Sequence, residues 1–337
     1  MKIINKISLL VVFLVVLVAI PQNSFAGKSN RIKIATLAPE GSTWMKALRK
    51  LDKELKKETG GELSFKFYPG GVSGDEKDVI RKMRIGQIHA AGFTGVGLGE
   101  LLPESRVLDL PFLFESDQEV EHVYEKLQGY FADKFEQKGY VLLGWVPIGW
   151  VHFFSKKEIV SIDDLRQTKT WMWEGDPLVQ TAYKTLGVSP FPLSVTDVLL
   201  SLQTGMIETV YASPVAALAL QWFTKIKYMS QTPMGFGVGG ILISKRKFKK
   251  LNDNQQEILK RLSGKFLKKL VHENNKDNVK SIQAMQGAGL KLAKKPDEKT
   301  VKEFRQLGKK VQEALVGKLF SVDLLKKVND SLKEVRK

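Results

Sequence analysis

The chain has 337 residues, with 53 lysines and arginines against 36 aspartates and glutamates, and it contains no cysteine. The lack of cysteine excludes a disulfide framework and a lipid-anchored N-terminal cysteine. The formal net charge of +17 suggests nucleic acid or an anionic membrane surface as a partner, but acidic residues are interleaved with the lysines along segments of helical pattern. We therefore interpret most of the lysines as solvent-exposed helix faces.

The N-terminus has the pattern of a secretory signal peptide. Two lysines precede an apolar run over residues 7–20, and a polar stretch then ends at residues 24–26. The apolar run is shorter than the roughly 20 residues of a membrane span. We predict a signal peptide over residues 1–26, cleavage after Ala26 and a periplasmic mature protein without a nucleic-acid partner. An uncleaved membrane anchor is the alternative.

Strand and helix patterns alternate in the first part of the mature chain. Residues 31–36, 62–68 and 88–93 have the pattern of strands, and residues 42–58 and 74–85 that of helices. This β-α-β-α-β order predicts a parallel sheet covered by helices. In such folds the ligand lies at the carboxyl ends of the strands.

A second alternating unit follows. Strand patterns lie at residues 141–145, 150–155, 170–173 and 209–212, and helical patterns at residues 177–186 and 196–204. We expect a turn at Pro190 and Pro192, between the two helices. The two units predict two α/β lobes. A helical tract over residues 254–286 is long enough to cross both lobes, and residues 297–337 read as two further amphipathic helices.

Motifs that would indicate an enzyme are missing. Residues 71–74 lack the spacing of a serine nucleophile elbow, and the glycines of residues 95–99 lack the spacing of a dinucleotide-binding loop. We expect a backbone turn beside a cleft at these glycines. We expect a structural role for each of the widely separated histidines His89, His122, His152 and His272. We therefore predict no catalytic residue, metal or cofactor; a periplasmic hydrolase is the disfavoured alternative.

Several motifs occur in an order and spacing that resemble one known family. They include Ala35-Thr36-Leu37-Ala38-Pro39-Glu40-Gly41-Ser42, Tyr68-Pro69-Gly70-Gly71, Leu110-Pro111-Phe112-Leu113-Phe114 and Ser201-Leu202-Gln203-Thr204-Gly205-Met206-Ile207-Glu208. The combination runs over nearly all of the mature chain. It is similar to the substrate-binding proteins of tripartite ATP-independent periplasmic (TRAP) transporters, the dicarboxylate-binding-protein family.

The resemblance implies an α/β fold with two lobes, a type II periplasmic-binding-protein-like clamshell in which a long helix braces both lobes. We expect residues 27–148 and 237–276 to form lobe I, and residues 149–236 and 277–337 to form lobe II. The resemblance also implies a small-molecule ligand between the lobes and hinge closure on binding. The partner would be a membrane transporter with a small and a large integral subunit. We expect the binding protein itself to be a monomer.

Three ligand-contacting positions of the family carry different residues in this chain. The family arginine that pairs with a ligand carboxylate falls on Trp171, a second arginine falls on Val151, and an asparagine falls on Ser213. Two of these replacements are apolar. The resemblance therefore does not extend to the usual dicarboxylate or sugar-acid ligand.

The residue types at the expected cleft predict a hydrophobic or aromatic ligand. Trp171 and Trp173 lie on one face of their strand because side chains alternate with a period of two. The other candidate ligand-binding residues are Leu37, Phe93, Thr94, Trp150, Val151, Glu174, Ser213 and Phe236. Apolar walls with few polar groups suit an apolar ligand, although the tryptophans could instead form interlobe core.

Two alternatives concern charged groups near the tryptophans. Glu174 or Asp176 could hold a cationic amine beside the aromatic rings, unless Asp176 only caps the helix that begins at Pro177. Lys169 or Arg166 could instead replace the missing arginine and bind a conventional organic acid. A different class of function is also open, since an envelope accessory protein could use the basic helices without any functional cleft.

Overall fold

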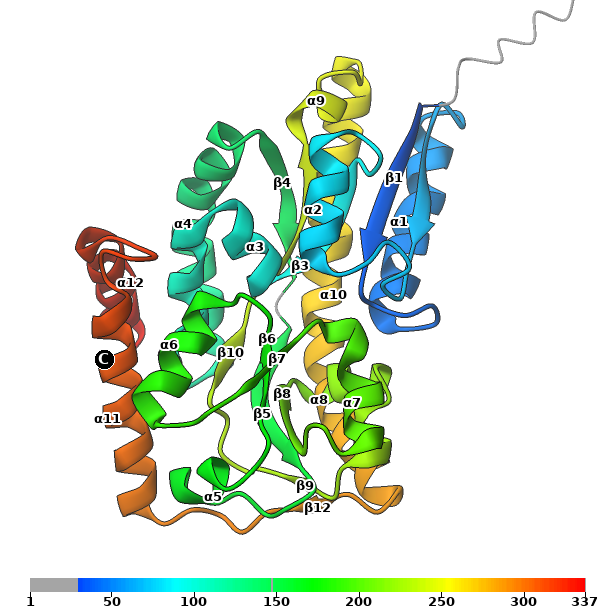
Figure 1. The fold of residues 1–337 in the computed structure, drawn as a ribbon. Coiled ribbons are helices and arrows are strands. Elements are labelled where there is room, and N and C mark those ends of the chain that lie inside the picture. Colours follow the sequence, from blue (N-terminus) through cyan, green and yellow to red (C-terminus); the bar gives the residue numbers. More distant parts are fainter. Residues whose placement is uncertain (1–29, 147, 337) are drawn as a thin grey trace, which may run out of the picture.

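The computed structural model describes residues 30–146 and 148–336. The predicted signal peptide and its cleavage site therefore lie outside the described residues. Within the described part, no helix combines the length and the apolar character needed to cross a bilayer. Two main sheets and a group of C-terminal helices make up the fold (Figure 1).

The first sheet has the strand order β2-β1-β3-β11-β4. Its strands are β1 (Asn30–Thr36), β2 (Leu63–Tyr68), β3 (Ala90–Thr94), β4 (Tyr140–Trp145) and β11 (Gly239–Ser244). β1 is parallel to β2 and β3, as the alternating pattern predicted, whereas β11 is antiparallel to β3 and β4. A late segment of the chain thus returns to the sheet built by the early one.

Helices accompany this sheet, and α1 shows how the sequence sets their limits. They are α1 (Thr43–Glu58), α2 (Glu76–Arg84), α3 (Gly95–Leu101), the 3-10 helix η1 (Pro103–Asp109), α4 (Asp117–Gln137) and α9 (Lys245–Phe248). The Ser42 hydroxyl accepts a hydrogen bond from the Met45 amide at the start of α1. After the helix ends, Gly60 and Gly61 take positive φ angles of 58° and 86°, which glycine tolerates best.

The second sheet has the order β10-β5-β9-β12, with β8 paired to β5. Its strands are β5 (Gly149–Ser155), β8 (Thr209–Ala212), β9 (Tyr228–Met229), β10 (Gly235–Gly237) and β12 (Lys291–Leu292). The helices of this half are α5 (Ile162–Arg166), α6 (Pro177–Leu186), η2 (Val195–Asp197), α7 (Val198–Thr204), α8 (Pro214–Ala219) and η3 (Trp222–Lys225).

A separate two-stranded sheet corrects one prediction. β6 (Trp171–Trp173) pairs in parallel with β7 (Phe191–Leu193), which occupies the segment where we expected a turn. Pro192 is tolerated in β7 because this strand pairs on one side only, so the amide hydrogen that proline lacks is not required for a second partner. The pair places Trp171 and Trp173 beside Leu193.

The C-terminal helices connect the two halves. α10 (Asp253–Gly287) has 35 residues and packs on α1 and β4 of the first half and on α8 and β5 of the second, which confirms the predicted bracing helix. α11 (Glu298–Leu315) packs on α6, and α12 (Val322–Val335) packs on α4. In Figure 1, α10 runs along both halves, while α11 and α12 lie along one edge of the molecule.

Candidate ligand-binding site

A cavity of about 240 Å³ is lined by residues from both halves of the molecule. Thr36 and Thr94, the last residues of β1 and β3, contribute to its wall on the side of the first sheet. β6, β8 and β10 contribute residues from the other half. The cavity therefore lies at the carboxyl ends of parallel strands, the position that the sheet pattern predicted.

Eight of the ten predicted ligand-binding residues line this cavity. They are Leu37, Phe93, Thr94, Val151, Trp171, Trp173, Ser213 and Phe236. Most of the remaining lining residues are also apolar, among them Leu178, Val179, Ala216, Leu220 and Val238.

Trp150 and Glu174, the other two predicted residues, do not line the cavity. The Trp150 indole donates a hydrogen bond of 2.8 Å to the Asp117 carboxylate and packs edge-on against Phe236, so its ring lies behind the wall. Glu174 is exposed at the turn that follows β6. The two-residue alternation that placed Trp171 and Trp173 together does not govern a side chain in that turn.

The two cations considered as substitutes for the family arginine also lie outside the cavity. Arg166 bonds to the Asp163 carboxylate and to the Leu186 carbonyl, at 2.7 Å each. The Lys169 ammonium donates to the Gly205 carbonyl at 3.3 Å. Neither side chain is available to a ligand in this arrangement.

Trp171 is both a cavity residue and part of an aromatic cluster. Its ring stacks on Tyr211 with a centroid separation of 4.8 Å and meets the ring of Trp222 edge-on at 5.3 Å. Its indole nitrogen donates to the Leu193 carbonyl at 3.0 Å, and the residue is only 1% exposed. The β6–β7 pairing thus holds the indole in one orientation, as a rigid apolar wall.

Asp75 joins the two halves beside the cavity. This residue caps α2, and its Oδ2 accepts hydrogen bonds from the Trp173 indole at 2.9 Å and the Ser194 hydroxyl at 2.8 Å. The Val195 amide donates to the same oxygen at 3.3 Å. A single carboxylate from the first half therefore accepts from three donors of the second.

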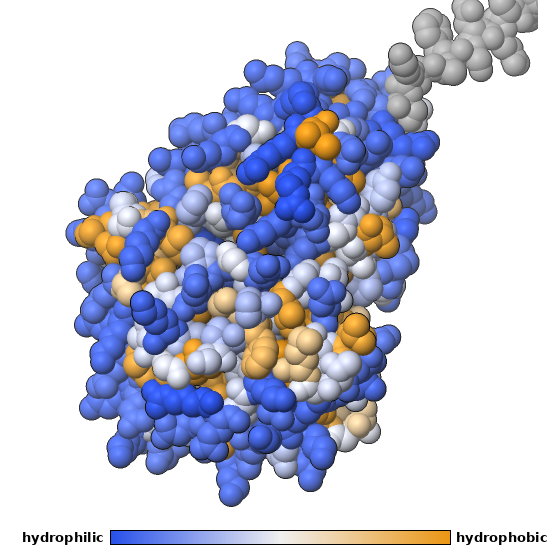
Figure 2. Space-filling model, in the orientation of Figure 1, coloured by the Kyte–Doolittle hydropathy of each residue, from blue (hydrophilic) through white to orange (hydrophobic). Residues whose placement is uncertain are grey.

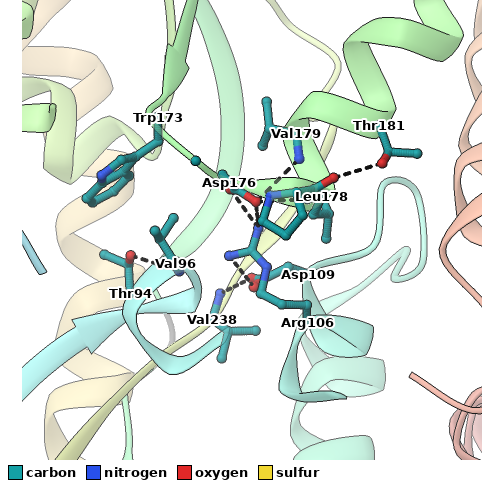
Figure 3. Close-up of polar contacts among 12 residues, drawn as sticks. Thr94, Val96, Arg106, Asp109, Trp173, Asp176, Leu178, Val179, Thr181 and Val238 are labelled. Carbon is teal, nitrogen blue, oxygen red and sulfur yellow. Dashed lines mark hydrogen bonds and ion pairs between the residues drawn. The ribbon is translucent and has the colours of Figure 1, made fainter. Parts of the chain in front are cut away.

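Arg106 forms a second connection, with Asp176 (Figure 3). Its Nη2 donates to both carboxylate oxygens of Asp176, at 2.9 and 3.1 Å, and its Nη1 lies 3.3 Å from Asp109 Oδ2. Asp176 also accepts from the Leu178 and Val179 amides, which confirms its predicted role as a helix cap. Burial lowers the pKa of Arg106, but the adjacent Asp176 and Asp109 carboxylates outweigh it and raise that pKa above its usual value.

Two carboxyl groups of the wall have raised pKa values. Burial raises the pKa of Glu76 to about 7, although its carboxylate accepts hydrogen bonds from the Thr94 amide and hydroxyl and from the Gly97 amide. Burial also raises the pKa of Asp109 to about 6, against the attraction of Arg106. In both cases removal from water disfavours the charged form more than the hydrogen bonds and the cation favour it.

The glycines of residues 95–99 belong to α3, not to the turn that we expected. A side chain at Gly95 would overlap Asp109, and one at Gly99 would overlap Arg106. Glycine is required because this short helix packs directly on the ionic group of η1, and the sequence spacing alone could not indicate that neighbour. Sequence reasoning placed Asp75 and Glu76 only at the start of a helix and missed their place beside the cavity, and it missed Arg106 and Asp109 entirely, since no local pattern pairs these residues with their distant partners.

The ionisable residues that line the cavity carry an excess of negative charge. They comprise three carboxyl groups, from Glu76, Asp109 and Asp176, and one guanidinium, from Arg106. Because Arg106 already faces two of the carboxylates, it has little attraction left for an anionic ligand. The wall is otherwise mainly apolar.

Among the described residues, no group of three or more histidine, cysteine or acidic side chains could hold a metal ion. His89 accepts from the Lys33 amide, His152 contacts the Ser230 carbonyl, and His122 contacts Glu334. These are structural partners, in agreement with the prediction for these three residues. The His272 side chain lies outside the described part.

Comparisons with known proteins agree with this architecture. Residues 34–316 match the family model described as bacterial extracellular solute-binding protein, family 7. The 2,3-diketo-L-gulonate-binding periplasmic protein of Escherichia coli is 27% identical over 327 residues, which cover 94% of this chain and 96% of that protein.

Solved structures show the same fold. A TRAP periplasmic solute-binding protein from Pseudomonas putida F1 with bound D-glucuronate has a TM-score of 0.82 at 24% identity, covering 89% of this chain and 96% of that one. An extracytoplasmic solute receptor from Bordetella pertussis that binds pyroglutamic acid also has a TM-score of 0.82, at 18% identity, covering 90% and 99%. The predicted two-lobed type II clamshell is confirmed.

The family match spans most of the chain, and the resemblance inferred from the sequence motifs is confirmed at the level of the family. Its members and the structural neighbours are periplasmic binding proteins, as predicted, and have no enzymatic role. The chain belongs to family 7 of the bacterial extracellular solute-binding proteins.

Proposed function

We propose that this protein binds a small hydrophobic or aromatic solute that carries no carboxylate, and delivers it to a TRAP-type membrane transporter. The transporter would consist of a small and a large integral subunit. The observation that carries the proposal is the composition of the cavity wall, where apolar side chains predominate and three carboxyl groups accompany a single guanidinium, which two of them already contact.

The charge balance of the wall disfavours an anionic ligand. Arg106 is held by Asp176 and Asp109, so a ligand carboxylate would have to compete with two protein carboxylates for one cation. Two like charges 4 Å apart repel by about 4 kcal/mol at an effective dielectric constant near 20. An uncharged or cationic ligand with an apolar body meets no such cost.

The family resemblance supports the same class of ligand. On that alignment of motifs, Trp171 occupies the position of the arginine that pairs with a carboxylate, and Val151 and Ser213 occupy two other polar positions. An indole cannot donate the paired hydrogen bonds of a guanidinium. The ring of Trp171 offers apolar contact in its place.

The proposed mechanism is closure of two lobes on the ligand. We assign residues 27–148 and 237–276 to one lobe and residues 149–236 and 277–337 to the other, with the protein acting as a monomer. A ligand that contacts both lobes favours the closed state through its binding energy. The Asp75 and Arg106 connections would form on closure and add to it.

Probes that share a phenyl ring and differ in charge test the ligand class. Isothermal titration calorimetry would compare phenethyl alcohol, phenethylamine and hydrocinnamate. We expect the alcohol or the amine to bind at least about tenfold more tightly than the acid, because of the carboxylates in the wall. Tightest binding of hydrocinnamate would contradict the proposal.

A pair of variants at one position sharpens the test. Trp171→Arg restores the charge found in the family, and Trp171→Leu removes the indole without adding charge. We expect hydrocinnamate to gain affinity in Trp171→Arg only. An equal response of both variants would indicate a change in cavity size and would argue against an electrostatic role for this position.

An organic acid is the second candidate ligand. It is favoured by relatives and neighbours named for 2,3-diketo-L-gulonate, D-glucuronate and pyroglutamic acid. In that case Arg106 would have to bind the acid, and its Nε, which has no hydrogen-bond partner among the described residues, would be one available donor. Loss of acid binding in Arg106→Lys, with retained folding, would support this candidate.

A further inference from the structure

We propose that one end of the first lobe docks on an anionic phospholipid surface. This basic end comprises six cations and one exposed apolar residue from β1, the end of α2, and α9 with the turn that follows it. They are Lys33, Arg84, Arg246, Lys247, Lys249, Lys250 and Ile85. The inference does not depend on which solute the cavity binds.

Contacts bring these distant segments together. The Lys247 ammonium donates to the Asn30 side-chain oxygen at 2.6 Å, and the Asn30 side-chain nitrogen donates to the Lys250 carbonyl at 3.5 Å. A side chain at Gly86 would overlap the Arg246 guanidinium, so Arg246 lies over the turn that contains Ile85. The start of β1, the end of α2 and α9 therefore form one continuous surface, at the end of the molecule far from β12 and α5 (Figure 1).

Most of the positive charge of this surface has no direct acidic partner among the described residues, although the Glu136 carboxylate is close enough to Lys249 for its pKa to be lowered by that charge. None of the six cations forms an ion pair with another described residue, whereas the neighbouring Lys245 pairs with Glu136 at 2.9 Å. The lysines of this surface also affect His89. Burial lowers the pKa of His89 to about 4, and the positive charges of Lys247, Lys33 and Lys250 contribute to that shift. Burial and the charge of Lys250 likewise lower the pKa of Lys247.

Ile85 adds an exposed apolar side chain next to Arg84 and to the turn over which Arg246 lies. The residue follows the exposed Arg84 at the end of α2, and its side chain is 67% exposed. In the orientation of Figure 1, an apolar spot stands out in the hydrophilic surface where α2 and α9 end (Figure 2). Basic side chains around an exposed apolar residue are the combination that binds the interface of an anionic bilayer.

The position of the basic end suits a protein that works beside a membrane. No residue of the basic end lines the ligand cavity, so docking there would leave the cavity accessible. Attraction to lipid would raise the local concentration of the binding protein near its membrane partner.

Vesicle co-sedimentation tests the proposal with the processed protein purified from the periplasm. Vesicles of phosphatidylcholine mixed with phosphatidylglycerol would be compared with phosphatidylcholine alone, over a range of salt concentrations. We expect binding only to the anionic vesicles and a steep loss with added salt. No binding to anionic vesicles at low salt would overturn the proposal.

Charge-matched variants separate this surface from the general positive charge of the protein. The triple variant Arg246→Glu, Lys249→Glu, Lys250→Glu should weaken vesicle binding by at least about 100-fold, because each basic side chain near the membrane contributes about fivefold. The control Lys302→Glu, Lys309→Glu, Lys310→Glu makes the same charge change at exposed positions of α11. The control should retain most of the binding, and an equal loss in both variants would refute a specific surface.

Ile85→Ser tests the apolar contact and should weaken binding less than the triple variant does. Unchanged melting temperatures would show that the variants fold. If Ile85→Ser and the triple variant both bind anionic vesicles like the unaltered protein, this end of the lobe has no role in lipid docking.

Discussion

The cavity and the basic end use charge in opposite ways. In the cavity, the single guanidinium of Arg106 contacts the carboxylates of Asp109 and Asp176, and the third carboxyl group, of Glu76, accepts hydrogen bonds from Thr94 and Gly97. At the basic end, six cations stand without an ion pair among the described residues. A chain with a net charge of +17 therefore has a ligand cavity in which carboxyl groups outnumber cations.

The difference follows from solvation. Charges at the basic end keep much of their water, so mutual repulsion is screened and costs little stability. Charges at the cavity are buried, so each must be paired, hydrogen-bonded or protonated. Substitutions in the two regions should therefore have very different effects on folding, even where they remove the same charge.

The largest difference in stability between the two regions should appear when one cation is removed from each. Arg106→Ala leaves Asp109 and Asp176 buried without their cation, and should lower the free energy of unfolding by about 3–5 kcal/mol. Lys250→Ala at the basic end should change it by less than about 0.5 kcal/mol. Denaturant unfolding of both variants measures the contrast, and similar losses would show that the cavity charges are not coupled as described.

The pH dependence of stability should show the effect of ionising the buried Glu76 carboxyl group. Its folded pKa of about 7 lies above the ordinary value of 4.5, so its ionisation should reduce stability as the pH rises from about 4.5 to 7. The full effect is about 3 kcal/mol. Glu76→Gln should lose this decline, most clearly between about pH 6 and 7, where more than half of Asp109, with its pKa of about 6, is already ionised.

Glu136→Gln is the matched control for that measurement. Glu136 is exposed, and its hydrogen bond with Lys245 lowers its pKa, so its contribution to stability is lost as the pH falls rather than as it rises. The control should keep the decline between pH 4.5 and 7. An unchanged pH profile in Glu76→Gln would show that ionisation of Glu76 does not cause the decline in stability.

Removal of two helix caps should destabilise the protein to different extents, because one of the capping residues also joins the lobes. Asp75→Ala removes the acceptor of three donors from the second half and should cost about 1–3 kcal/mol beyond the loss of a cap. Asp297→Ala removes an exposed cap at the start of α11 and should reduce stability less than Asp75→Ala does. Small-angle X-ray scattering should show a larger radius of gyration for Asp75→Ala alone, and equal compactness would contradict a closing role.

The smallest effects should mark the boundary of the site. Trp173→Phe loses the hydrogen bond to Asp75 and a cavity wall atom, and should weaken ligand binding by about fivefold to tenfold. Trp150→Phe loses a bond to Asp117 outside the cavity and should leave ligand affinity unchanged. Calorimetry with the tightest of the three phenyl probes compares them, and an effect of Trp150→Phe would extend the site beyond its present limits.

Much of the fold could be predicted from periodicity. The limits of α1, α6 and α10 follow from helical spacing and from the capping residues Ser42, Asp176 and Asn252. β7 was missed because two prolines indicate a turn, and only the pairing with β6 explains why one of them is tolerated. Strands as short as β9 and β12, with two residues each, carry no period to detect.

The apolar part of the site was also predictable, since strand alternation and strand ends place Phe93, Trp171 and Trp173 near a cleft. The ionic part was not. Arg106 and Asp176 are 70 residues apart, and only the approach of η1 to the start of α6 pairs them. Long-range pairing of single charged residues has no signature in one sequence.

Native mass spectrometry of the protein purified from the periplasm, followed by identification of any released molecule, tests the central claim most directly. The account predicts one small molecule per chain, apolar in its body and neutral or positively charged. A retained organic acid that is lost in Arg106→Lys would contradict that claim and would assign the cavity to anionic solutes.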